Sequence, residues 1–243
     1  MHRGMVRLKP TVSSLLHVFL MAPALTVLWI EGLPHITTFW FYVFNYWTRA
    51  LGMEATIAMV PQHWSKVVEF SLPFVSAQAG TITPSLWLTA SILTIAVFAA
   101  TFWFPEDQAP WSYLLRALVL IQTSALIYFA VASARFPHDI PTYIMSMLSF
   151  GVILIGMIPI VLAFTYYIFD FSFWKKLAIT ALIMAHLTLF FPLQFVLQAY
   201  ILHFSILFMP LLYFAFGPFL DVLIFVCLYS WAMSWKSRSQ SFT

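Results

Sequence analysis

Long apolar runs separated by short polar stretches make up most of this chain. Five runs are long enough to cross the hydrocarbon core of a bilayer, which takes a helix of about 20 residues. They cover residues 12–30, 86–104, 113–132, 146–167 and 177–197. Each run predicts one transmembrane helix.

The next stretch, residues 198–235, is too long for one ordinary crossing. As a single helix it would measure about 57 Å, at about 1.5 Å per residue. Pro210 removes a backbone donor inside it, and Gly217-Pro218 is typical of a helix end followed by a new helix start. We therefore expect a sixth span at 217–235 and a re-entrant or interfacial segment at 198–216.

The distribution of basic residues supports six spans. Lys and Arg near helix ends accumulate on the cytoplasmic side. The six-span arrangement puts eight of the eleven basic residues on one side, namely Arg3, Arg7, Lys9, Arg116, Lys175, Lys176, Lys236 and Arg238. A seventh span would place six basic residues on one side of the membrane and five on the other. We therefore expect both termini in the cytoplasm.

Composition agrees with this topology. Hydrophobic residues make up 63% of the 243 positions and charged residues only 8%, with a mean hydropathy of +0.93. A soluble domain carries roughly 25% charged residues, and the single Cys227 cannot form an internal disulfide. The sequence therefore predicts an all-α, polytopic transmembrane bundle of about six spans.

Four regions follow from this arrangement. Residues 1–30 form a basic N-terminus and a first helix, which we interpret as uncleaved because apolar sequence continues past the small-residue site at 22–24. Residues 31–85 form an outer, periplasmic-side interfacial segment. Residues 86–235 form a five-span bundle, and residues 236–243 form a cytoplasmic tail.

The outer segment begins with an aromatic stretch at 38–47. Trp and Tyr favour the headgroup layer, where the ring stays in apolar surroundings and its polar atom reaches water. The interfacial aromatic candidates are Phe39, Trp40, Tyr42, Tyr46 and Trp47. Membrane anchoring is the simpler hypothesis, and a lipid entrance or a docking face is the alternative. Residues 61–70 predict a second amphipathic piece, and 77–84 a polar loop.

Histidines on the outer side are candidate metal ligands. Imidazole is a common ligand for copper and zinc, and the candidates are His35, His63, His138 and His203. Their spacing matches no compact ligand motif. Ordinary surface histidines are therefore the favoured interpretation.

The loop at 135–141 holds a second group of polar residues. Arg135 is suited to binding a phosphate or carboxylate, and His138 with Asp139 is a candidate proton-transfer pair. These three residues are the weak catalytic candidates. A rigid turn with polar side chains in water is the favoured alternative.

Few polar residues lie inside the spans, where each needs a partner. Gln194 and Gln198 share one helix face, which favours bonding to another helix. Asp221 sits in a first helical turn if the last helix begins at 217–218, and is a buried acid if that helix continues upstream. His17 and His186 are weak candidates for axial haem ligands.

No motif specifies an activity. The chain has no H-E-x-x-H site, P-loop, G-x-S-x-G elbow or Gly-rich dinucleotide turn, and no cofactor is firmly implied. The leading hypothesis is a non-enzymatic subunit or accessory factor of a larger membrane complex in a bacterial inner membrane, with lipids and other integral subunits as partners and no nucleic acid. One alternative is a small transporter or channel for an ion or lipid-like substrate. The other is an outer-leaflet enzyme acting on a lipid-linked substrate.

Overall fold

Helices dominate the computed structural model, which describes residues 12–63, 69–166 and 173–233. Five helical stretches in this part of the chain are long and apolar enough to cross a membrane: Phe19–Ala50, Glu106–Ala132, Ile140–Tyr166, Phe173–Phe204 and Ile206–Ala232. Helix α2 (Pro84–Ala100) is also apolar, but has only 17 residues. The predicted helical membrane class is confirmed, and α2 occupies the place of the second predicted span.

The centre of the molecule is formed by α4 (Ile140–Tyr166) and α5 (Phe173–Phe204), which pack against each other and against α1 (Val12–Ala50). These helices supply most of the main core cluster. Close packing is possible where the residues are small. At Gly151 of α4 an added Cβ would lie 2.1 Å from the ring of Phe191 on α5.

Helix α1 is continuous over 39 residues and passes through both Pro23 and Pro34. The sequence predicted a first helix that ends at residue 30 and a separate aromatic piece at 38–47. A proline removes one backbone donor but bends a helix rather than ending it when packing holds both halves. Here Trp29 donates its Nε1 proton to the carbonyl of Val152, and Trp40 donates to that of Thr188, so both sides of Pro34 are held.

The aromatic stretch of α1 divides between core and surface. Trp40 is fully buried and stacks on Phe191 with 6.2 Å between ring centroids, so its assignment to the interface is wrong. The other four candidates are exposed: Phe39, Tyr42, Tyr46 and Trp47. The helix therefore has one face in the core and one aromatic face outside it.

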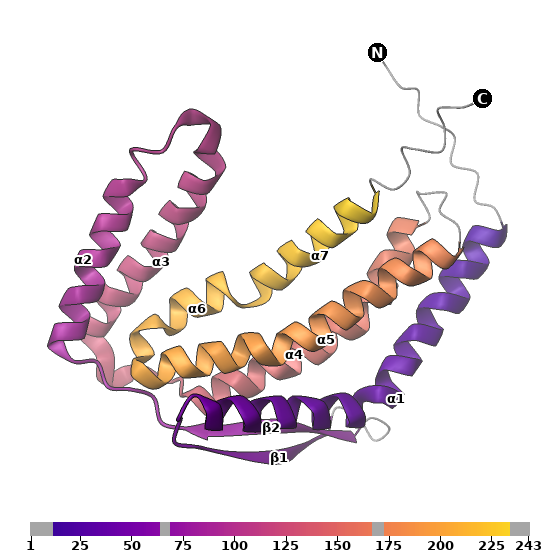
Figure 1. Cartoon of the computed structure of the whole chain (residues 1–243), viewed down its shortest axis with the longest axis horizontal. Helices are drawn as coiled ribbons and strands as arrows, with labels where there is room; N and C mark the ends of the chain where they lie inside the picture. Colours follow the sequence, from indigo (N-terminus) through magenta and orange to yellow (C-terminus); the bar gives the residue numbers. More distant parts are fainter. Residues whose placement is uncertain (1–11, 64–68, 167–172, 234–243) are drawn as a thin grey trace.

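A β-hairpin follows α1. Strands β1 (Ala55–His63) and β2 (Glu69–Ala77) pair antiparallel, with Ala55 opposite Ala77. Part of this hairpin replaces the amphipathic piece predicted at 61–70. Strand β2 packs against α1 and α4 through buried Leu72 and Val75, beneath the helices in Figure 1.

The loop predicted at 77–84 is present and packs tightly against the end of α5. The amide of Gly80 donates to the carbonyl of Leu202, and Ile206 donates to the carbonyl of Gly80. An added Cβ on Gly80 would lie 2.1 Å from the backbone oxygen of Phe204. A glycine at this position therefore allows the loop backbone to reach the helix backbone.

Helices α2 and α3 (Ala109–Ala132) form a hairpin that stands apart from the α4–α5 pair in Figure 1. Trp87 donates to the carbonyl of Leu126 and joins the two helices. Near their connection, Arg116 donates to Thr101 and lies 4.9 Å from the centroid of the Phe102 ring. The hairpin reaches the bundle mainly through contacts between α3 and α6.

The region 198–216 differs from the predicted re-entrant segment. Helix α5 continues to Phe204, and a short turn leads into α6 (Met209–Ala215) and α7 (Pro218–Met233). Together these form one kinked candidate span, with Gly217 at the break. An added Cβ on Gly217 would lie 2.1 Å from the Tyr213 carbonyl oxygen, so the tight break requires glycine.

The packing of Gly151 predicts a difference between two glycine variants. Gly151→Ala should lower unfolding free energy by about 1–3 kcal/mol, because the buried Phe191 ring cannot move aside freely. Gly32→Ala on α1 is the matched control, since its nearest neighbour would be 3.5 Å away. Thermal unfolding in detergent measures both. Equal transition temperatures would contradict the packing seen between α4 and α5.

Candidate intramembrane binding site

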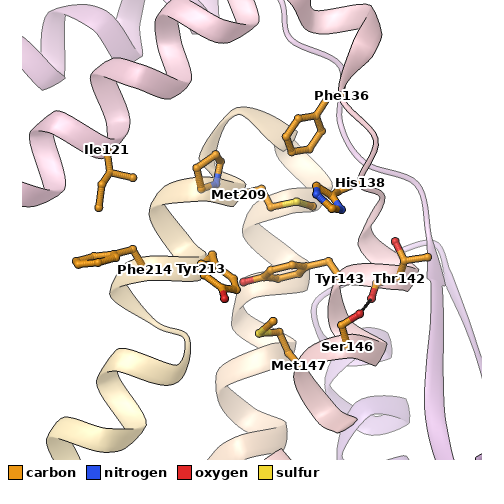
Figure 2. A pocket seen from close by; sticks show the side chains of 11 residues that line it. Ile121, Phe136, His138, Thr142, Tyr143, Ser146, Met147, Met209, Tyr213 and Phe214 are labelled. Carbon is orange, nitrogen blue, oxygen red and sulfur yellow. Dashed lines mark hydrogen bonds between the residues drawn. The ribbon is translucent and has the colours of Figure 1, made fainter. Parts of the chain in front are cut away.

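A cavity of about 480 Å³ lies between α3, α4 and the α6 region (Figure 2). Much of its wall is apolar. Hydroxyl groups and one imidazole occur among the side chains drawn in Figure 2, and no Asp, Glu, Lys or Arg is among the lining residues. The lining consists of Ile121, Phe136, His138, Thr142, Tyr143, Ser146, Met147, Met209, Pro210, Tyr213 and Phe214.

The polar groups of this wall come from the first turns of α4, from His138 before that helix and from Tyr213 on α6. Ser146 donates its hydroxyl proton to the carbonyl of Thr142 at 2.8 Å, so its side chain is held against its own helix. Tyr143 and Tyr213 lie next to each other at the cavity, with 6.5 Å between ring centroids. One wall can therefore offer hydrogen bonds while the remainder contacts hydrocarbon.

Behind Tyr143, a chain of hydrogen bonds connects three helices. The Tyr143 hydroxyl donates to Oε1 of Gln198 at 2.5 Å, and Nε2 of Gln198 donates to the carbonyl of Phe216 at 2.6 Å. Gln194 also donates its Nε2 proton to the carbonyl of Phe216. The helix break at Gly217 leaves this carbonyl open to side-chain donors, and backbone groups in a membrane need such partners.

The structure thus brings together the polar intramembrane residues singled out from the sequence. Gln194 and Gln198 bond the α6–α7 break, and the amide of Gln194 is also the polar neighbour of Asp221. Their partners Tyr143 and the Phe216 carbonyl were missed. The Gly217-Pro218 pair was the available signal, because a helix break implies free carbonyls.

Asp221 combines two situations that the sequence presented as alternatives. It lies in the first turn of α7, yet that helix is the second half of a kinked span, and the side chain is only 1% exposed. Its Oδ2 atom has no hydrogen-bond partner among the described residues. The carboxyl group is therefore both at a helix N-terminus and buried.

Asp139 in the 135–141 loop has a structural role. Its Oδ1 accepts the backbone proton of Thr142 at 3.0 Å and also the Thr142 hydroxyl proton, so it caps α4. The hydrogen bond from the Thr142 side chain lowers the pKa of this carboxyl group below its usual value. Arg135 and His138 are exposed, and no hydrogen bond joins either to Asp139 in the described part of the chain. A catalytic role for the three stays a prediction.

The histidine candidates for a metal site are dispersed. His35 is exposed on α1, His138 lines the cavity, and Nδ1 of His203 lies 3.2 Å from the carbonyl oxygen of Gln78. The side chain of His63 is outside the described residues. Among those that are described, no three His, Cys, Asp or Glu side chains form a group that could hold a metal ion.

Only one of the two haem candidates has a described side chain. The His17 side chain lies outside the described residues. His186 is half-buried on α5, where its ring stacks on Phe190 with 4.3 Å between centroids. Axial ligation by this pair stays a prediction.

Comparisons with known proteins give no relative. No family model, curated protein or solved structure matches the chain. The geometry of the chain itself therefore carries the functional argument.

Gln122 gives a contrast to Gln198. It is 5% exposed, lines a smaller cavity of about 200 Å³ between α2, α3 and the α6 region, and has no partner for Oε1 or Nε2 among the described residues. An unsatisfied buried amide costs free energy that a satisfied one does not.

Leucine variants at the two glutamines should therefore behave oppositely. Gln198→Leu should lower stability by about 1–2 kcal/mol, because Tyr143 and the Phe216 carbonyl both lose a partner. Gln122→Leu should leave stability unchanged or raise it. Thermal unfolding in one detergent compares them, and equal losses would show that hydrogen bonding does not distinguish these sites.

Proposed function

We propose that this chain binds a lipid-like amphiphile in the cavity between α3, α4 and α6, and acts as a small membrane carrier for it. The observation that carries the proposal is a cavity among membrane-length helices, with an apolar wall and a hydroxyl-lined part. Its volume of about 480 Å³ falls within the range of small-molecule sites.

The chemistry of the wall selects the ligand class. Met147, Met209 and Phe214 suit an acyl chain, and methionine adapts to irregular hydrocarbon. Tyr213 and His138 can bond a polar headgroup. Because no charged side chain lines the cavity, recognition rests on hydrogen bonds and apolar contact.

The kinked α6–α7 span also favours a carrier over a rigid scaffold. Interrupted helices line substrate sites in many transporters, because a break exposes polar backbone near the bilayer midplane. Here the Phe216 carbonyl is held by Gln198, which in turn holds the cavity residue Tyr143. Changes at the break can therefore reach the cavity wall through two hydrogen bonds.

For the orientation, we propose a bacterial inner membrane with both termini cytoplasmic. In Figure 1 the α2–α3 connection lies on the same side as the start of α1 and the end of α7. The β-hairpin and the α3–α4 connection lie on the opposite side. Arg116 bonds Thr101 near the α2–α3 connection, and Lys175 lies in the first turn of α5, which begins near the start of α1 in Figure 1. These two basic residues support placement of the first side in the cytoplasm.

Single cysteines test this orientation. In a Cys227→Ser background, Asp107→Cys should react with a membrane-impermeant maleimide only from the cytoplasmic side, and Arg135→Cys only from the periplasmic side. Both positions are exposed in short 3-10 segments. Labelling is compared between intact cells and inverted vesicles, which shows the side of the membrane on which each cysteine lies. Labelling of both positions from one side would contradict the arrangement.

A cavity-filling variant tests amphiphile binding. The probe is a phospholipid with a diazirine in its acyl chain. Because Ser146 lines the cavity, Ser146→Trp should reduce cross-linking of this probe about tenfold, which corresponds to about 1.4 kcal/mol of binding free energy. Ser124→Trp on α3 is the matched control, since Ser124 is also exposed and bonds its own helix but does not line the cavity. Mass spectrometry locates cross-links on α3, α4 and α6.

Equal cross-linking of these helices in the two variants would contradict the proposed site.

Purification of the cross-linked protein also tests the second candidate function, a subunit or accessory factor of a membrane complex. The outward aromatic face of α1, with Tyr42 and Tyr46 both about two-thirds exposed (64% and 66%), favours it. A stoichiometric second chain that copurifies, with no lipid cross-linked in the cavity, would support the subunit instead of the carrier.

A further inference from the structure

Asp221 is one of the residues around a separate cavity of about 210 Å³ between α4, α5 and α7, and the surface exposed in this cavity is apolar. Asp221 is 1% exposed and its Oδ2 atom has no partner in the described chain. Every other residue that lines this cavity is apolar, among them Leu154, Leu187 and Phe225. A buried carboxyl oxygen without a partner therefore lies beside a cluster of apolar side chains.

An ionised carboxylate in such a place is costly. Removal of an unpaired charge from water into hydrocarbon costs free energy, and intramembrane acids accordingly hold a proton or a cation. Metal cations need several oxygen ligands, six or more in the case of calcium. The side chains around Asp221 in this cavity carry no oxygen atom, so the proton is the ligand that the chemistry fits.

We propose that Asp221 is a proton-binding site within the α6–α7 span. The proton binds Oδ2 from water and returns to water, so only this O–H bond forms and breaks. The neighbouring polar group is the neutral amide of Gln194 on α5. Asp221 is the only titratable residue among those that line the cavity from α4, α5 and α7. His186, also on α5, stacks on Phe190 instead.

The site is connected to the rest of the polar network. Gln194, the polar neighbour of Asp221, donates to the Phe216 carbonyl, which also accepts from Gln198. A protonated carboxyl group is a donor as well as an acceptor, whereas the ionised group only accepts. Binding of a proton therefore changes what Gln194 can bond at the helix break. This site goes beyond the proposed amphiphile function and does not depend on it.

Carbodiimide labelling of the full-length protein in liposomes tests the proposal. Dicyclohexylcarbodiimide partitions into the membrane and reacts with protonated carboxyl groups, and peptide mass spectrometry identifies the adduct. We expect an adduct on Asp221 that falls by roughly a factor of ten per pH unit once the ionised form dominates. Added sodium chloride should not change it. Asp139 is the internal control, because it is exposed and caps a helix.

Absence of an adduct on Asp221, or labelling that is independent of pH, would overturn the proposal. Suppression by sodium ions at constant pH would show a metal-cation site instead and would also overturn it. The measurement uses the native side chain, so it does not require that an Asp221 variant folds. Its outcome is separate from lipid cross-linking in the Ser146→Trp and Ser124→Trp proteins, because Asp221 does not line that cavity.

Discussion

The need to satisfy backbone polar groups inside a membrane explains much of this structure. The α6–α7 break leaves the Phe216 carbonyl open to side-chain donors, and Gln194 and Gln198 on α5 both donate to it. These bonds stabilise the kinked form of the α6–α7 span relative to a straight helix. Met209, Tyr213 and Phe214, which precede the break, form one wall of the larger cavity. The cavity therefore depends on a helix interruption that two amides stabilise.

The same constraint organises the other side of the bundle. Indole N–H groups of Trp29 and Trp40 donate to backbone carbonyls of α4 and α5, so α1 stays attached on both sides of Pro34. Trp87 does the same between α2 and α3. Tryptophan suits this role because it combines a large apolar surface with one donor. The resulting bundle has a closely packed centre and a separate α2–α3 hairpin that leaves space for ligands beside α3.

Parts of the fold and site follow from sequence pattern, and others do not. The apolar runs predicted the main helices. Spacing selected Gln194 and Gln198, which both bond the Phe216 carbonyl, and the scarcity of charge in the spans selected Asp221, which is buried. The hairpin at 55–77 was missed because Pro61 and Pro73 lie inside its strands, and proline argues against a strand. Trp40 was assigned to the interface because composition does not show which helix face meets α5. Tyr143 gave no signal, since one tyrosine in an apolar run is common.

The sequence by itself determined that the chain belongs in a membrane and where its apolar helices lie, because hydropathy and helix length are local properties. It also determined that few ionisable groups would enter the spans. Only the tertiary structure decided which polar atoms have partners. Gln198 bonds two groups while Gln122 bonds none of the described residues, although both are glutamines in apolar helices. The difference arises because a hydrogen bond depends on the position of a partner from another helix, which no local pattern specifies.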